Sequence, residues 1–121
     1  MTARPACLAL VDGYVAGATI AHEYAFGLHR KLVAVNADDD RSHELLRESV
    51  AVTLEVSTVV QRLYGLENKW IEQDLLDPPE AERTAQLLND CVAELVPELA
   101  ALRDRQGKIV SELVDLVSNL R

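Results

Sequence analysis

Two of the three histidines of this chain lie seven residues apart, in the segment AHEYAFGLH that runs from Ala21 to His29. Imidazole titrates near neutral pH and is a common metal ligand, so His22 and His29 could serve in proton transfer or in metal binding. A spacing of seven also places both rings on one face of a helix, within a stripe of apolar side chains. The pair therefore predicts either a reactive site or a polar layer inside a helical bundle.

Glu48 and Glu55 are the predicted partners of these histidines. A chain that folds back through the turn NADDD, centred near residue 38, brings His29 opposite Glu48 and His22 opposite Glu55. The two layers would then lie roughly 10 Å apart, at 1.5 Å per residue, so one metal ion cannot reach both of them. Two interpretations stay open: a His–Glu hydrogen-bonded layer that fixes the helix register, or a ligand site that a second subunit completes.

The composition excludes several other classes of function. The 121 residues carry a net charge of −8, and 49% of them are hydrophobic while only 4% are aromatic. Nucleic acids and anionic membranes attract clusters of Lys and Arg, so neither is predicted as a partner. The sequence has no Gly-rich phosphate loop, no G-x-S-x-G and no H-E-x-x-H. We therefore assign no cofactor, no metal and no catalytic residue from local motifs.

The cysteines and the N-terminal segment predict a cytoplasmic protein. Cys7 and Cys91 are far apart in apolar surroundings, as expected for small buried side chains in a reducing compartment. The apolar run from Ala6 to Ala21 could be taken for a signal peptide. However, Asp12 interrupts that run, and the run is shorter than the ~20 residues that a membrane span needs. We expect a core helix there.

Three long helical stretches are predicted. The first begins near Pro5 and ends by Ala37, and the second begins at Asp39 or Asp40 and ends near Gly65. The β-branched run over residues 50–60 could form a strand, but its apolar spacing of three and four favours a helix. Residues 66–76 are expected to form a short connecting helix.

The third stretch begins at DPPE, where Asp77 is predicted to cap, Pro78 to take the first helical position and Glu80 to complete a capping box. After this start signal, apolar residues recur at alternating steps of four and three, with a single polar residue among them. This seam consists of Leu88, Val92, Leu95, Leu99, Leu102, Gln106, Ile109, Leu113, Leu116 and Leu120. Such a heptad pattern is typical of helices packed along their length. Pro97 should kink or split this helix.

The sequence therefore predicts an all-α fold: an antiparallel bundle of three long helices plus a short connecting helix, with the third helix kinked near Pro97. We expect one domain over residues 1–121. Small residues recur at intervals of four along the first helix, which permits the close approach of another helix, either within the chain or across a dimer. These residues are Ala9, Gly13, Gly17, Ala21 and Ala25.

The stripe and the C-terminal seam together offer more apolar surface than a thin bundle covers, so a homodimer is expected. The predicted contact residues are Gly13, Gly17, Ala21, Trp70, Leu99 and Leu113. The expected function is a protein interaction or regulatory module (an adaptor, inhibitor or scaffold component) that works as a homo-oligomer. The alternative is a metal- or small-molecule-dependent enzyme that uses the interior His/Glu pairs.

Overall fold

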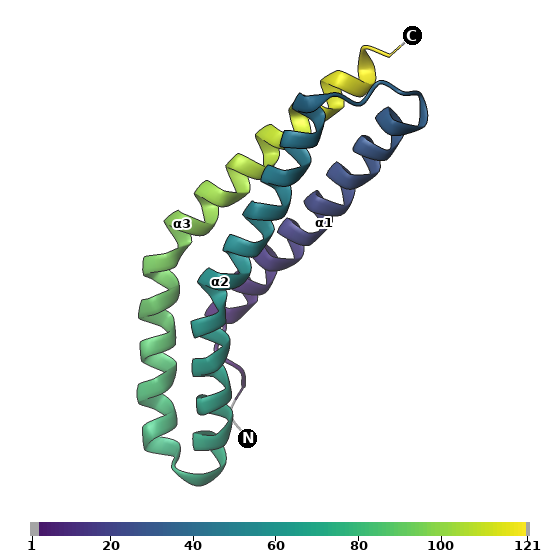
Figure 1. The fold of residues 1–121 in the computed structure, drawn as a ribbon. Helices are drawn as coiled ribbons and strands as arrows, with labels where there is room; N and C mark the ends of the chain where they lie inside the picture. The colour runs from purple at the N-terminus through teal and green to yellow at the C-terminus, as the bar shows by residue number, and fades with distance from the viewer. Residues whose placement is uncertain (1–2, 121) are drawn as a thin grey trace.

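Three long α-helices build the computed structural model, which describes residues 3–120: α1 (Cys7–Ala34), α2 (Asp40–Leu76) and α3 (Pro78–Ser118). Helix α2 runs antiparallel to both of its neighbours, so α1 and α3 run in the same direction (Figure 1). The β-branched run over residues 50–60 lies within α2, and the described residues contain no strand. The all-α prediction is confirmed.

Helix α1 covers only part of the hairpin that α2 and α3 form (Figure 1). Beyond the beginning of α1, the hairpin continues as two helices alone. The segment before α1 lies beside this part, because Arg4 forms ion pairs with Glu67 of α2 and Asp12 of α1. The molecule therefore has a three-helix half and a two-helix half.

The end of α1 is fixed by a left-handed residue, Asn36, whose φ is 54°. Asn tolerates this conformation better than most residues, because its short polar side chain can form local hydrogen bonds. The N–H of Ala37 donates to the carbonyl of Leu32 at 2.9 Å, and the N–H of Asn36 donates to the carbonyl of Val33 at 3.1 Å. This is a Schellman motif, which satisfies the last carbonyls and reverses the chain at once. Helix α1 consequently ends at Ala34, within the predicted limit of Ala37.

The start of α2 carries a reciprocal capping box. The N–H of Ser42 donates to Asp39 Oδ1 at 2.8 Å, and Ser42 Oγ accepts from the N–H of Asp39 at 2.9 Å. Of the two predicted caps, Asp39 and Asp40, the structure uses Asp39. The predicted end at Gly65 is wrong, because α2 continues to Leu76 and no separate connecting helix forms. A helical glycine costs about 1 kcal/mol, which the burial of Leu63 and Trp70 on either side outweighs.

Asp77 alone connects α2 to α3. Its N–H donates to the carbonyl of Gln73 at 2.7 Å, and its own carbonyl accepts from the N–H of Ala81 at 3.1 Å. The side chain of Asp77 makes no capping hydrogen bond, so the predicted capping box with Glu80 does not form. Asp77 is both the last capping residue of α2 and the first of α3, so its backbone conformation is the one that reverses the direction of the chain between the two helices. Pro78 occupies the first turn of α3, as predicted.

Helix α3 is continuous through Pro97, and it buries the predicted heptad seam from Leu88 to Leu113, with Leu95 half-buried. Figure 1 shows that α2 and α3 change direction together along their length. Among the described residues, no helix is both long enough and apolar enough to cross a bilayer.

Candidate functional site

A polar layer crosses the three-helix half, and each helix contributes one side chain to it. His22 Nδ1 of α1 lies 2.8 Å from Ser49 Oγ of α2, and Gln106 Nε2 of α3 donates to the same oxygen at 2.8 Å. Ser49 and Gln106 are buried, and His22 is half-buried. Because Ser49 Oγ accepts from Gln106, its own proton can be donated to Nδ1 of a neutral imidazole. The layer therefore joins all three helices at one level.

Ser49 and His22 have the side chains of a nucleophile and its general base, but the serine is not exposed to solvent. A serine within 2.8 Å of a histidine could in principle be activated for attack on a substrate. Ser49 is fully buried, however, so no substrate can reach its oxygen without separating the helices. The arrangement serves to align the helices.

The predicted partners of the histidines lie elsewhere. Glu55 pairs with Arg105 of α3 at 3.4 Å and Glu48 lies 3.9 Å from Arg41, both near the surface. The predicted pairing of His22 with Glu55 and of His29 with Glu48 is therefore wrong. The reason is the register: α1 ends early at Ala34, and the observed contacts are symmetric about residue 36, whereas the prediction placed the turn near residue 38.

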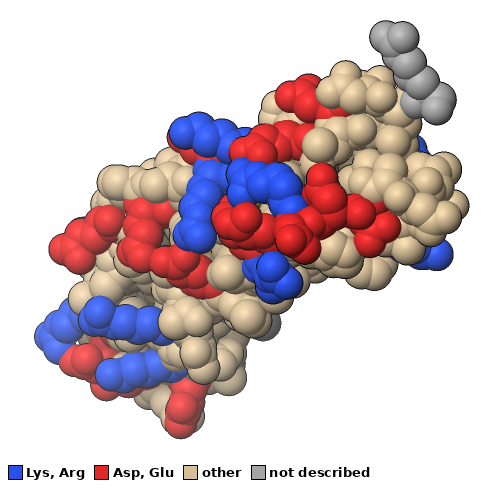
Figure 2. Space-filling view, turned by 45° about the horizontal axis from the view of Figure 1, so that its top comes forward, with Lys and Arg blue, Asp and Glu red and all other residues tan. Residues whose placement is uncertain are grey.

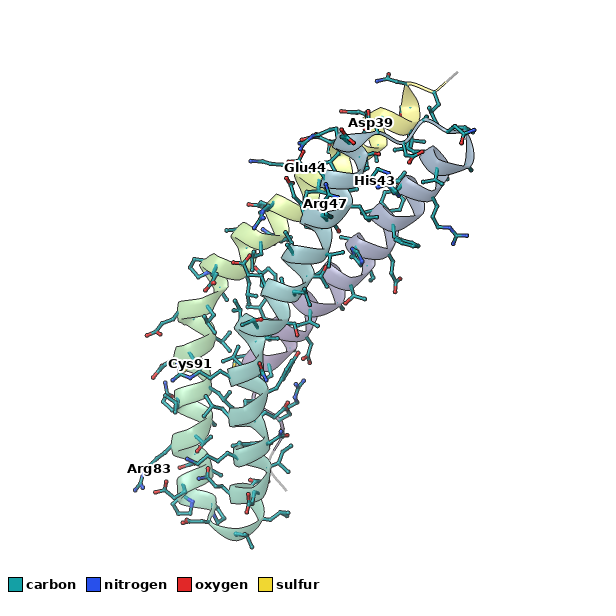
Figure 3. The ribbon with its side chains drawn as sticks, viewed as in Figure 1. Asp39, His43, Glu44, Arg47, Arg83 and Cys91 are labelled. Atoms are coloured by element: carbon teal, nitrogen blue, oxygen red, sulfur yellow. The ribbon has the colours of Figure 1, made fainter. Side chains whose placement is uncertain are left out.

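The second histidine belongs to a different contact. The ring of buried His29 meets the ring of His43 edge to face, with the centroids 4.7 Å apart, and His43 Nε2 lies 2.9 Å from Asp38 Oδ2. The hydrogen bond to His43 lowers the pKa of the Asp38 carboxyl. His29 Nε2 has no hydrogen-bond partner within residues 3–120. Figure 3 shows Asp39 and His43 on the first turns of α2, where α1 ends.

These groups do not combine into a metal site. Across the described part of the chain, no three His, Cys, Asp or Glu side chains come together in a way that could hold a metal ion. Cys7 and Cys91 are both free thiols, and burial raises the pKa of the Cys7 thiol.

Asp12, the charge within the apolar first helix, has a specific set of partners. It accepts hydrogen bonds from Arg4 and, at 2.8 Å, from the hydroxyl of Tyr64. The Arg4 guanidinium and then the Tyr64 hydroxyl hold the pKa of Asp12 below its ordinary value. Burial, with the Asp12 carboxylate beside it, raises the pKa of Tyr64 to about 12. The network fixes the N-terminal segment on α1 and α2.

A cavity of about 210 Å³ opens between α1 and α3, with α2 as its floor. Gly13, Gly17 and Ala21 line it from α1, and Gln106 and Gly107 line it from α3. A Cβ atom placed on any of these three glycines would meet no atom within 4 Å. The predicted close helix approach along Gly13 and Gly17 therefore does not occur within the chain. The glycines instead border open space.

The outer face of α1 carries an apolar seam, which we call the outer seam. Its steps alternate three and four, and its members are Leu10, Gly13, Gly17, Ile20, Tyr24 and Gly27. All six are exposed, including Leu10 at 50%, Ile20 at 65% and Tyr24 at 55%. Sequence reasoning identified only the row with steps of four from Ala9 to Ala25. That row drifts about 40° per step around a helix of 3.6 residues per turn, so it runs from exposed Ala9 to buried Ala25.

The other predicted contact residues lie in the core. Trp70, Leu99 and Leu113 are buried within the single chain, so they are not available to a partner in this arrangement. Ala21 is half-buried at the wall of the cavity. Comparison with protein-family models, with curated proteins and with solved structures gave no match.

Proposed function

We propose that this protein is a helical interaction module that works as a homo-oligomer, and that its subunits associate through the outer seam of α1. The observation that supports this proposal most strongly is the exposure of Leu10, Ile20 and Tyr24 in one heptad row, with glycines between them. A helix that is apolar on all sides is normally enclosed by other helices. In the single chain, α1 has such neighbours on one side only.

The charge distribution agrees with this choice of helix. Helix α1 has four charged residues over 28 positions, whereas α2 has eleven over 37. Figure 2 shows Asp and Glu side chains interspersed with Lys and Arg over the face that it presents. From Gly13 to Leu28, α1 has a single formally charged residue, Glu23. An exposed face with so few charges favours association with another apolar surface.

A second copy of the chain fits the outer seam because the seam is self-complementary. Heptad spacing lets the side chains of one helix enter the gaps on an identical helix. Small residues allow two backbones to approach closely. A two-fold interface of this kind uses the same surface on both subunits. A regulatory role as an adaptor, inhibitor or scaffold component, in the cytoplasm where Cys7 and Cys91 stay reduced, belongs to the same proposal.

The bend of α3 is also part of this proposal. Pro97 has no N–H to donate to the carbonyl of Ala93, and its ring crowds the preceding turn. It lies two residues before Leu99, which lines the cavity. We infer that Pro97 sets the direction of α3 along the cavity wall.

A pair of matched variants tests the association. Ile20→Glu places a charge at the centre of the outer seam, whereas Leu54→Glu makes the same change on α2 at a side chain that is 63% exposed, close to the 65% of Ile20. Sedimentation equilibrium should show a dimer for the wild type and for Leu54→Glu. We expect Ile20→Glu to weaken the dimer at least a hundredfold, about 3 kcal/mol. A wild type that stays monomeric at 100 μM (roughly 5 kcal/mol of association) would refute the proposal.

A further inference from the structure

Three of the five glycines of the chain line the cavity between α1 and α3. Gly13 and Gly17 lie in α1 and Gly107 lies in α3, all with a helical backbone that other residues can adopt. Glycine destabilises a helix relative to alanine, and a Cβ at any of the three positions would meet no atom within 4 Å. Neither backbone conformation nor packing within the chain therefore requires glycine here. What the three residues provide is space.

This space has apolar walls and the size of a small ligand. Val52 and Val56 line it from α2, and Leu99 lines it from α3. An apolar cavity of about 150 Å³ binds benzene. The cavity of this protein is larger, about 210 Å³, so it has room for an apolar group of roughly eight carbon atoms.

A single positive charge lies at the cavity. Of the described residues that line it, Arg103 alone is charged, although the chain has a net charge of −8. The guanidinium carbon of Arg103 lies 5.6 Å from the centre of the Tyr14 ring, another lining residue, and the face of an aromatic ring attracts a cation. Asp104 approaches Arg103 Nε at 3.5 Å. A guanidinium has five N–H donors, so donors remain for a ligand. The Arg103 side chain is 64% exposed, and a ligand from solvent can therefore reach it.

We infer that this cavity binds a small aliphatic carboxylate, with its hydrocarbon tail between α1 and α3 and its carboxylate on Arg103. A guanidinium donates two parallel hydrogen bonds to a carboxylate. The other polar side chain at the cavity, Gln106, is 2% exposed and already donates to Ser49, so the charge of the ligand belongs at Arg103. Apolar walls with a few polar groups that fix orientation are typical of small-molecule sites. All these residues belong to one chain, so the inference goes beyond the association of subunits and does not depend on it.

Nuclear magnetic resonance tests this inference on the full chain, with sodium octanoate as the probe. The amide signals of Gly13, Gly17 and Gly107 report binding at the cavity directly. They should shift with a dissociation constant of about 1 mM or tighter, as expected for a ligand of roughly ten non-hydrogen atoms. Octan-1-ol keeps the tail and acetate keeps the charge, and each should bind about tenfold more weakly than octanoate, or worse. Acetate binding as tight as that of octanoate, or no shift at about 10 mM octanoate, would overturn the inference.

A first pair of matched variants tests the charge. Arg103→Gln should weaken octanoate binding about tenfold, because charge-assisted hydrogen bonds are lost, and should change octan-1-ol binding by less than about twofold. Arg105→Gln removes the same charge from a neighbouring exposed arginine that does not line the cavity, and should leave octanoate binding unchanged. Equal octanoate affinities of the two variants would overturn the inference.

A second pair tests the space. Gly107→Leu adds a side chain at the cavity wall, away from the outer seam, and should weaken both octanoate and octan-1-ol about tenfold or more, because the tail loses apolar burial. Gly65→Leu makes the same change at a helical glycine outside this cavity, and should leave both affinities unchanged. Circular dichroism confirms that each variant is folded. Unchanged octanoate binding in Gly107→Leu would overturn the inference, whatever the oligomeric state. A monomeric wild type that binds octanoate would support the inference and refute only the proposed function.

Discussion

The imidazole of His22 and the hydroxyl of Ser49 lie 2.8 Å apart, and this contact joins α1 to α2 at the level where Gln106 of α3 donates to the same oxygen. One residue from each helix meets at a single buried oxygen. The contact fixes how far each helix slides along the others, and thereby which residues of α1 face outward.

Replacing Ser49 should therefore destabilise the bundle. Ser49→Ala leaves Gln106 Nε2 and His22 without a partner inside the protein, and we expect a loss of about 1–3 kcal/mol in the free energy of unfolding. The control is Ser57→Ala, at an exposed serine of the same helix, which should change that free energy by less than about 0.5 kcal/mol. Urea unfolding followed by circular dichroism measures both. Equal effects of the two substitutions would show that the polar layer contributes nothing specific.

High pH should weaken the fold through Tyr64. Its pKa is raised from 10.0 to about 12, so the folded protein holds the phenolic proton more tightly than the unfolded chain does. The stabilisation is complete below pH 10.0 and is lost as the pH rises toward about 12. Melting temperatures measured from pH 9 to pH 12 (a range around the ordinary tyrosine value of about 10) should fall more steeply for the wild type than for Tyr64→Phe. Parallel curves would contradict the role of the Asp12–Tyr64 hydrogen bond.

Gly65 offers a stabilising substitution away from the outer seam. It is exposed in the interior of α2, and a Cβ there would meet no atom within 4 Å. Gly65→Ala should raise the free energy of unfolding by about 0.5–1 kcal/mol, because alanine loses less backbone entropy in a helix. The dimer dissociation constant should stay the same, in contrast to Ile20→Glu. A destabilised Gly65→Ala variant would indicate that this glycine has a packing role.

The sequence allowed the helices to be predicted better than their mutual register. Periodic apolar residues define α3 and its seam, because the period depends on local geometry alone. The pairing of His22 depends on where α1 ends, and that end is set by the left-handed conformation of Asn36, which an Asn in a loop does not by itself reveal. A shift of six residues along α2 replaced Glu55 by Ser49 as the partner.

The same limit applies to the surface of α1. The spacing of Leu10, Ile20 and Tyr24 is visible in the sequence, but α1 also has an inner apolar face from Leu8 to Leu32. Nothing in one sequence decides which of two apolar faces is covered by the same chain. The position of α2 and α3 decides it, and leaves the outer seam exposed.

The most direct measurement is crosslinking of single cysteines along the outer seam, in a background with Cys7→Ala and Cys91→Ala. Two copies that associate through the outer seam bring seam residues near the two-fold axis close to their own copies, and a disulfide requires Cβ atoms about 3.5–4.5 Å apart. Under mild oxidation, at least one of Gly13→Cys, Gly17→Cys and Ile20→Cys should give a covalent dimer, while Leu54→Cys, at a similarly exposed position of α2, should stay uncrosslinked. Crosslinking at none of the seam positions, or equal crosslinking at Leu54→Cys, would contradict association through the outer seam.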